Sequence, residues 1–367
     1  MKMNFRTACI SCVVLLWALL SVSAWCVPAG EISEAERRPL SQMPEISADV
    51  MLSGDFMTDF EAYSLDQFPL RDAFRTLKSM FHFGVLNQSD NNNIYITNGY
   101  AVKQEYPLNP GSLNHAVDRL NHLYEKYLSD SLNQIYLAVV PDKGQYLAES
   151  SGHLSLDYHE MTAMLQTAMP WAAAIDLYDS LEYTDYYRTD THWRQEHLLE
   201  AASVLCKGMG AALPKEEDYR LTALERPFYG VYYGQAALPM EPETMYILKS
   251  DLLDACRVYD YESGMHTDVY NMDKLTSRDL YDVFLSGSRS LLTIENPDAA
   301  TDRELIIFRD SFGSAIAPLL VQGYAKVTLV DIRYIQIDVL ERFLEFHDQD
   351  ILLLYSTSVL NNSNTIK

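Results

Sequence analysis

Asp190 and His192 stand one residue apart in the stretch YYRTDTHWRQE, residues 186–196. In an extended turn the two side chains point to the same side, so the carboxylate can reach the imidazole ring and fix its tautomer. An imidazole held in this way is suited to act as a general base and acid near neutral pH. The spacing also has a plainer interpretation, in which Asp190 caps a helix that begins near Trp193 and His192 is an ordinary histidine.

Ser311 is the second candidate for chemistry. It follows the apolar run ELIIF and precedes the helix-like stretch GSAIAPLL, which places it on a tight strand-to-helix turn. A serine hydroxyl becomes a nucleophile when a neighbouring imidazole takes its proton. The backbone N–H groups of Ser311, Phe312 and Gly313 are expected to point out of the helix N-terminus, where an oxyanion is stabilised. The alternative is that Ser311 or Asp310 only caps the helix.

The elements that must position these residues alternate along the chain. Strand patterns cover residues 134–143, 172–181, 304–310, 326–331 and 350–356. Helix patterns cover residues 112–131, 158–171, 194–210, 313–323 and 337–346. This alternation predicts an α/β fold with a mainly parallel sheet covered on both faces, and chemistry gathers at the carboxyl ends of such strands.

The rest of the chain is divided by composition. Residues 1–29 form a leader, residues 30–95 a linker and N-terminal helical region, and residues 96–367 the catalytic domain, with an irregular, tyrosine-rich insertion near 213–285. Pro69 is expected to break the helical stretch at 54–84. The pair Asn98-Gly99 between apolar runs predicts a hairpin.

The leader predicts export. Lys2 and Arg6 precede an apolar run at residues 8–27, which is typical of a signal sequence. The sequence leaves two outcomes open for this leader. Cleavage after Ala24 gives a secreted protein, and the uncut run is long enough to anchor the chain to the outer face of the cytoplasmic membrane.

Charge and cysteines limit the function classes. The net charge of −23 argues against nucleic acid as a partner. Cys206 and Cys256 are either bridged in an oxidising compartment or buried free thiols. No pattern of cysteine and histidine suggests a zinc site, and we expect no metal and no cofactor.

Taken together, the motifs resemble a known family. YYRTDTHW, followed much later by RDSFGSAIAPLL and VTLVDIRYI, is similar to SGNH-hydrolase-like proteins of the alginate O-acetyltransferase (AlgX/AlgJ-like) type, and in particular to DHHW proteins. This sequence has Thr191 where many DHHW proteins have a second histidine. The resemblance extends over residues 33–362 and implies an SGNH-like three-layer sandwich with permuted motif order.

The resemblance also implies roles for individual residues. Ser311 would be the nucleophile, His192 the general base and acid, and Asp190 the carboxylate that orients the ring. Further candidates for oxyanion or substrate contact are Phe312, Gly313, Gly287, Arg333, Tyr187 and Arg188. Arg333 has an alternative role as the ion-pair partner of Asp331 or Asp310. Lys143, in VPDK, follows a strand and either faces the cleft or forms a surface ion pair, and we expect the ion pair.

The implied activity is acyl transfer by an exported serine enzyme. Its partner would be a cell-surface or secreted polysaccharide, or another acylated glycan, and a membrane acyltransferase would supply acetyl groups. An acetyl esterase would use the same three residues, because only the acceptor of the acyl group differs. The other alternative is a non-catalytic scaffold that binds glycan in the same cleft.

Overall fold

The fold was analysed in a computed structural model that describes residues 4–33, 35–130 and 134–367. The chain divides into two compact units. Unit 1 comprises residues 4–92, apart from residue 34, together with Tyr233–Pro239, and unit 2 comprises the remaining described residues. Lys2, part of the predicted signal, and Ser131, the end of a predicted helix, lie outside the described residues.

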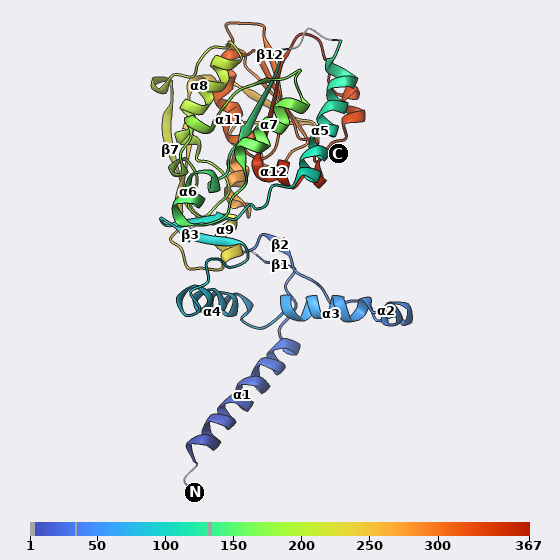
Figure 1. Ribbon diagram of the computed structural model, residues 1–367, viewed down its shortest axis with the longest axis vertical. Helices are drawn as coiled ribbons and strands as arrows, with labels where there is room; N and C mark the ends of the chain where they lie inside the picture. The colour runs from blue at the N-terminus through green and yellow to red at the C-terminus, as the bar shows by residue number, and fades with distance from the viewer. Residues whose placement is uncertain (1–3, 34, 131–133) are drawn as a thin grey trace. The chain divides into compact units, whose positions relative to one another are not determined.

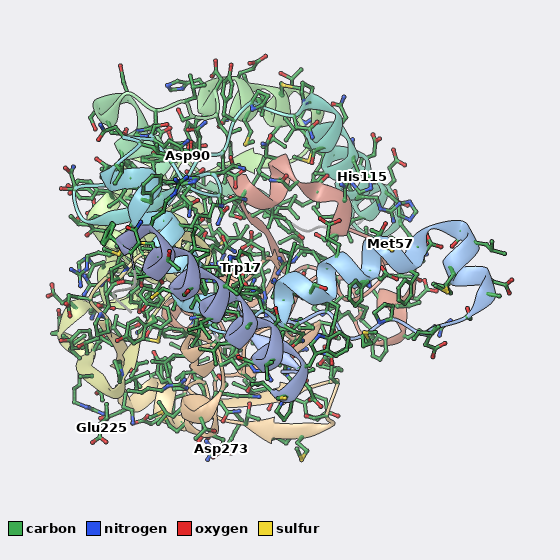
Figure 2. The ribbon with its side chains drawn as sticks, turned by 90° about the horizontal axis from the view of Figure 1, so that it is seen from below. Trp17, Met57, Asp90, His115, Glu225 and Asp273 are labelled. Atoms are coloured by element: carbon green, nitrogen blue, oxygen red, sulfur yellow. The ribbon has the colours of Figure 1, made fainter. Side chains whose placement is uncertain are left out.

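Unit 1 is mainly helical. Its elements are α1 (Phe5–Cys26), β1 (Ile32–Ser33), β2 (Arg38–Pro39), α2 (Ala48–Ser53), α3 (Asp55–Asp66) and α4 (Arg71–Gly84). The interval between α3 and α4 confirms the break at Pro69, since proline disfavours a helical conformation for the residue before it. Helix α1 is long and apolar enough to cross a membrane, which fits a signal peptide or an anchor. Trp17 on α1 and Met57 on α3 carry exposed side chains (Figure 2).

Unit 2 is built on an eight-stranded sheet with the order β10-β9-β11-β13-β12-β14-β5-β6. Its strands are β5 (Gln134–Val140), β6 (Ala173–Ala174), β9 (Arg257–Asp260), β10 (Met265–Thr267), β11 (Leu291–Glu295), β12 (Glu304–Arg309), β13 (Lys326–Val330) and β14 (Asp350–Ser356). The pairings from β13 to β6 are parallel, and those from β10 to β13 are antiparallel.

Helices cover both faces of this sheet (Figure 1). The covering helices are α5 (Pro110–Leu123), α7 (Tyr158–Ala168) and α12 (Thr357–Asn361) on one face, and α8 (Leu199–Gly208) and α11 (Gly313–Leu320) on the other. Alternate residues of β12 enter opposite cores, since Leu305 and Ile307 pack with α8 and α11 while Ile306 and Phe308 face α5 and α7. The predicted three-layer α/β architecture is confirmed.

The remaining elements test the finer expectations. They are β3 (Ile94–Thr97), β4 (Tyr100–Lys103), α6 (Gly144–Ser151), β7 (Arg220–Phe228), α9 (Val231–Ala236), β8 (Glu243–Lys249) and α10 (Asp251–Ala255). The hairpin at Asn98-Gly99 is confirmed, because β3 and β4 pair there and both turn residues have positive φ angles of 49° and 80°.

Three expectations of secondary structure are wrong. The stretch 172–181 forms only the two-residue strand β6, and 337–346 forms a short 3₁₀ turn instead of a long helix. Residues 213–285 are not irregular: β7 and β8 pair with each other, and β9 and β10 extend the main sheet. These strands are antiparallel, so they escape a search for alternating strands and helices.

The cysteines outside α1 are not bridged. Cys206 and Cys256 are buried free thiols, and burial raises the pKa of each thiol to about 12. Both pack in the core on the α8 and α11 side of the sheet. Of the two open alternatives, the structure therefore has the free thiols.

Candidate active site

Ser311 lies on the turn between β12 and α11, at the carboxyl end of a central parallel strand. The fully buried carboxylate of Asp310 builds this turn from both sides: Oδ1 accepts from the N–H of Phe312 at 3.0 Å, and Oδ2 accepts from the N–H of Ser356 at 2.8 Å. Ser356 ends the neighbouring strand β14, so Asp310 fixes the Ser311 turn to the sheet edge.

Asp190 and His192 come from the loop before α8. Oδ1 of Asp190 accepts from the backbone N–H of His192 at 3.0 Å and contacts its ring Nδ1 at 2.6 Å. Oδ2 accepts from the N–H of Val231 at 2.7 Å. The carboxylate is almost completely buried, and both of its oxygens are held by N–H groups of the surrounding backbone and ring. Asp190 is therefore a fixed acceptor that holds the proton of the ring on Nδ1.

The two motifs meet in unit 2. His192 Nε2 lies 2.8 Å from Ser311 Oγ, although 119 positions separate the residues in sequence. The contact completes a chain from Asp190 through His192 to Ser311, with both links at hydrogen-bond distance. The structure thus brings together the three residues that the sequence predicted as nucleophile, base and orienting carboxylate.

Aromatic packing fixes the loop against the serine turn. The indole Nε1 of Trp193 donates to the carbonyl of Phe312 at 3.1 Å, and the two rings meet edge to face. The buried ring of Tyr281 stacks on the imidazole of His192, with centroids 4.0 Å apart. The stacking of Tyr281 and the contact with Asp190 together hold the imidazole in one orientation.

The comparison with protein families agrees with this arrangement. Residues 175–330 match the family described as DHHW protein. The resemblance to DHHW proteins is confirmed. The matched segment, which we call the DHHW region, contains Asp190, His192 and Ser311. A search of curated proteins gives no match.

Solved structures share the fold. A DHHW family protein from Eubacterium siraeum DSM 15702 aligns with a TM-score of 0.62 and 21% identity, over 76% of this chain and 95% of that one. Bacillus cereus PatB1 with a sulfonyl adduct aligns with a TM-score of 0.57 and 17% identity, over 75% of this chain and 96% of that one. A second PatB1 structure gives a TM-score of 0.56, 18% identity, and coverage of 75% and 98%. These likenesses show a shared fold over about three-quarters of this chain.

Most of the N–H groups that were predicted to bind an oxyanion donate hydrogen bonds to other groups of the DHHW region. The N–H of Phe312 donates to Asp310 Oδ1, that of Gly313 to the carbonyl of Asp310 at 3.1 Å, and that of Gly287 to the carbonyl of Phe284 at 3.1 Å. The prediction that these three N–H groups face an oxyanion is therefore corrected. Among the described residues none accepts the N–H of Ser311.

The predicted cleft residues also have partners within the chain. The guanidinium of Arg333 makes a bidentate pair with Asp331, with contacts of 2.9 and 2.6 Å, which was its alternative role. Tyr187, a candidate for substrate contact, is fully buried against Phe228, so its side chain is not exposed to a substrate. Arg188 remains partly exposed beside Glu243, with Nε 3.6 Å from the carboxylate.

Four residues near the site were missed by the sequence interpretation: Gly230, Glu243, Gln195 and Tyr281. Glu243 accepts from the backbone N–H of Arg188 and of Thr189, just before Asp190. Gln195 donates to the carbonyl of Ala315 at 2.8 Å and thus joins the histidine loop to α11. No local pattern marks them, because each acts through a partner far away in sequence.

Gly230 allows the backbone to approach Asp190. A Cβ atom at this position would lie 2.2 Å from the carbonyl oxygen of Thr189 and 2.4 Å from Cβ of Asp190. We expect Gly230→Ala to lower the free energy of unfolding by about 2 kcal/mol or more and to lower turnover, because the loop must shift. Thermal unfolding measures the first effect. Gly84→Ala, whose Cβ would meet no atom within 4 Å, is the control, and equal losses in the two variants would contradict this account.

Lys143 does not form the predicted surface ion pair. It is 2% exposed, and Nζ donates to the carbonyls of Ala101 at 2.5 Å, Tyr187 at 2.9 Å and Arg188 at 3.4 Å. Burial lowers the pKa of Lys143 to about 7, and the nearby carboxylates, Asp190 among them, only partly oppose that shift. The ammonium group holds β4 against the backbone that leads into Asp190.

Lys143 should make folding stability depend on pH. Between about pH 7 and its ordinary value of 10.5, the folded chain binds one proton fewer at this site than the unfolded chain, so stability rises with pH. The unfolding free energy of the wild type relative to Lys143→Met is expected to increase by up to about 1.4 kcal/mol per pH unit in this window. Urea unfolding at several pH values measures it.

Lys126 provides the control for this prediction, because it is a surface lysine paired with Asp338 at 2.9 Å. The difference in unfolding free energy between the wild type and Lys126→Met is expected to stay constant over the same pH window. A flat difference for Lys143→Met as well would show that this lysine keeps its proton in the folded chain.

Proposed function

We propose that this chain is an exported serine acyl-transfer enzyme that moves acetyl groups on a cell-surface or secreted polysaccharide. The observation that carries the proposal is the contact of 2.8 Å between His192 Nε2 and Ser311 Oγ, with Asp190 2.6 Å from the other ring nitrogen. A serine with this environment has a base for its proton, and the base has a carboxylate that stabilises its charged form.

The acylation step follows from this geometry. Ser311 Oγ attacks the carbonyl carbon of an acetyl ester while its proton passes to His192 Nε2, and the carbonyl oxygen becomes an oxyanion. We assign the N–H of Ser311, which no described residue accepts, as the donor to this oxyanion. When the tetrahedral intermediate collapses, the bond to the leaving alcohol breaks, and His192 returns the proton to that alcohol. An acetyl group remains on Ser311.

Deacylation uses the same residues in reverse. A sugar hydroxyl gives its proton to His192 Nε2 and attacks the acetyl carbon, and Ser311 regains the proton when the ester bond breaks. Water in place of the sugar gives an esterase. We favour transfer because the motifs resemble those of the alginate O-acetyltransferase type, and because the apolar helix α1 fits export to the place where polysaccharides are modified.

The proposal is tested by acetyl release from p-nitrophenyl acetate. The wild type should turn over, and Ser311→Ala should lose at least about 10³-fold in kcat/KM. Ser314→Ala, three residues further along in α11, should keep its activity. An acetylated product that appears only when a glycan acceptor is added would indicate the transferase. Equal background rates in wild type and Ser311→Ala would instead favour a glycan-binding scaffold.

A further inference from the structure

Helix α4 turns its charged side inward. The guanidinium groups of Arg71 and Arg75 pair with Glu36 at 2.6 and 3.1 Å, and Arg75 also donates to the carbonyl of Gly234. Ser79 is completely buried on the same side, where its hydroxyl donates to the carbonyl of Ala236 at 2.7 Å. The inner face of this helix in unit 1 is therefore polar, and its ionic groups already have partners.

The opposite side of α4 and its C-terminal extension is apolar and exposed. Large side chains recur there at helical spacing, and each is between 42% and 62% exposed: Phe74, Leu77, Met80, Phe81 and Val85. We call these five residues the α4 apolar face. A water-soluble helix normally buries such a stripe and exposes its charges, so this reversed arrangement marks an interaction surface. The aromatic and aliphatic composition is typical of a helix that lies in a membrane interface.

Hydrogen bonds join the segment that follows α1 to the segment that precedes α4. The N–H of Gly30 donates to the side chain of Gln67 at 2.8 Å, and the amide of Gln67 donates back to the carbonyl of Gly30 at 2.9 Å. Gly30 lies four positions after Cys26, the last residue of α1, and Gln67 lies four positions before Arg71. Each of these two four-residue stretches extends at most about 14 Å, so the end of α1 lies within roughly 30 Å of the start of α4.

We propose that α1 remains as a membrane anchor and that the α4 apolar face lies in the interface of the same membrane. Helix α1 has 22 residues, or about 33 Å of helix, which matches a hydrocarbon layer of about 30 Å. The attraction is mainly apolar, because Arg71 and Arg75 are paired, Lys78 is a single exposed lysine at the edge of the α4 apolar face, and the chain carries a net charge of −23. The lipid contact should therefore form on zwitterionic lipid and persist at high salt.

The test uses the full chain in phosphatidylcholine nanodiscs. An environment-sensitive fluorophore is attached at Leu77→Cys, or at Met265→Cys as the control, after Cys9, Cys12 and Cys26 have been replaced by serine. Met265 is as exposed as Leu77, at 62%, but belongs to unit 2. A quencher carried on the lipid chains should reduce the emission at position 77 and leave position 265 unchanged, at low and at high salt.

Two results would overturn the proposal. A blue-shifted emission at position 77 that the lipid quencher does not reduce would show that protein, either a second copy or another chain, covers the α4 apolar face. If the membranes of the producing cell contain only protein that has been cleaved after Ala24, α1 is a signal sequence that is removed and not an anchor. Neither result depends on the serine chemistry, so the proposed activity stands or falls separately.

Discussion

Replacing His192 by alanine is expected to lower kcat/KM for acetyl ester turnover by about 10⁴-fold. The imidazole Nε2 lies 2.8 Å from Ser311 Oγ. When the ring proton sits on Nδ1 and faces Asp190, Nε2 has a lone pair that can take the proton of the hydroxyl. Without it, Ser311 must lose its proton to water, and the leaving alcohol has no acid. Steady-state kinetics with an activated acetyl ester measure the effect.

His197 offers a matched control for that variant. It lies five residues further along, pairs with Asp185 at 3.0 Å, and has no contact with Ser311 among the described residues. His197→Ala is expected to keep kcat/KM close to that of the wild type. Similar losses in the two variants would mean that changes in the fold, and not the missing base, lower the activity.

Asp190→Asn is expected to reduce kcat by about 10⁴-fold with little change in KM. The carboxylate accepts from Nδ1 and from the N–H groups of His192 and Val231. An amide in its place offers an N–H to the ring, which favours the tautomer with the proton on Nε2, and this tautomer cannot take the proton of Ser311. Separate determination of kcat and KM distinguishes this effect from a loss of substrate binding.

Asp185→Asn is the matched control for the carboxylate, because Asp185 pairs with the surface residue His197. Its activity should stay near the wild-type value. The account of Asp190 would be contradicted if Asp190→Asn retained more than about a tenth of the wild-type kcat, since the tautomer would then not depend on this carboxylate.

The three residues of the proposed site could be singled out from sequence because each lies in a short local motif, but their roles came from the resemblance between the motifs and a known family. Asp190 and His192 form a short pair, and Ser311 follows an unmistakable buried strand. The parallel order of β12, β14 and β5 then brings strand ends to one edge of the sheet. The α/β class follows from the same alternation of strands and helices.

The supporting residues could not be predicted, because their roles depend on distant partners. Gly230 and Glu243 lie in a segment that looked irregular, yet both pack under the loop of Asp190. Lys143 follows a strand within VPDK, which is typical of an exposed turn, but β4 and the Tyr187 backbone cover it. The antiparallel strands β9 and β10 follow each other without a helix between them, so the alternation of strands and helices does not reveal them.

The hydrogen-bond partners of the predicted oxyanion donors could not be predicted from sequence either. A strand-to-helix turn predicts several free N–H groups, and Phe312 and Gly313 were assigned that role. The side chain and carbonyl of Asp310 accept from both. Only the three-dimensional path of the turn reveals that Asp310 accepts from these donors and so holds the turn of Ser311 in place.

Covalent labelling of Ser311 tests the central claim most directly. Sulfonyl fluorides modify activated hydroxyl groups, and a sulfonyl adduct is present in a structure of Bacillus cereus PatB1, which shares the fold of unit 2. The chain is treated with an aryl sulfonyl fluoride and mapped by peptide mass spectrometry. We predict a single sulfonylated residue, Ser311, whose labelling is lost in His192→Ala. Labelling spread over other hydroxyl groups, or equal labelling of Ser311 without His192, would contradict an activated serine nucleophile.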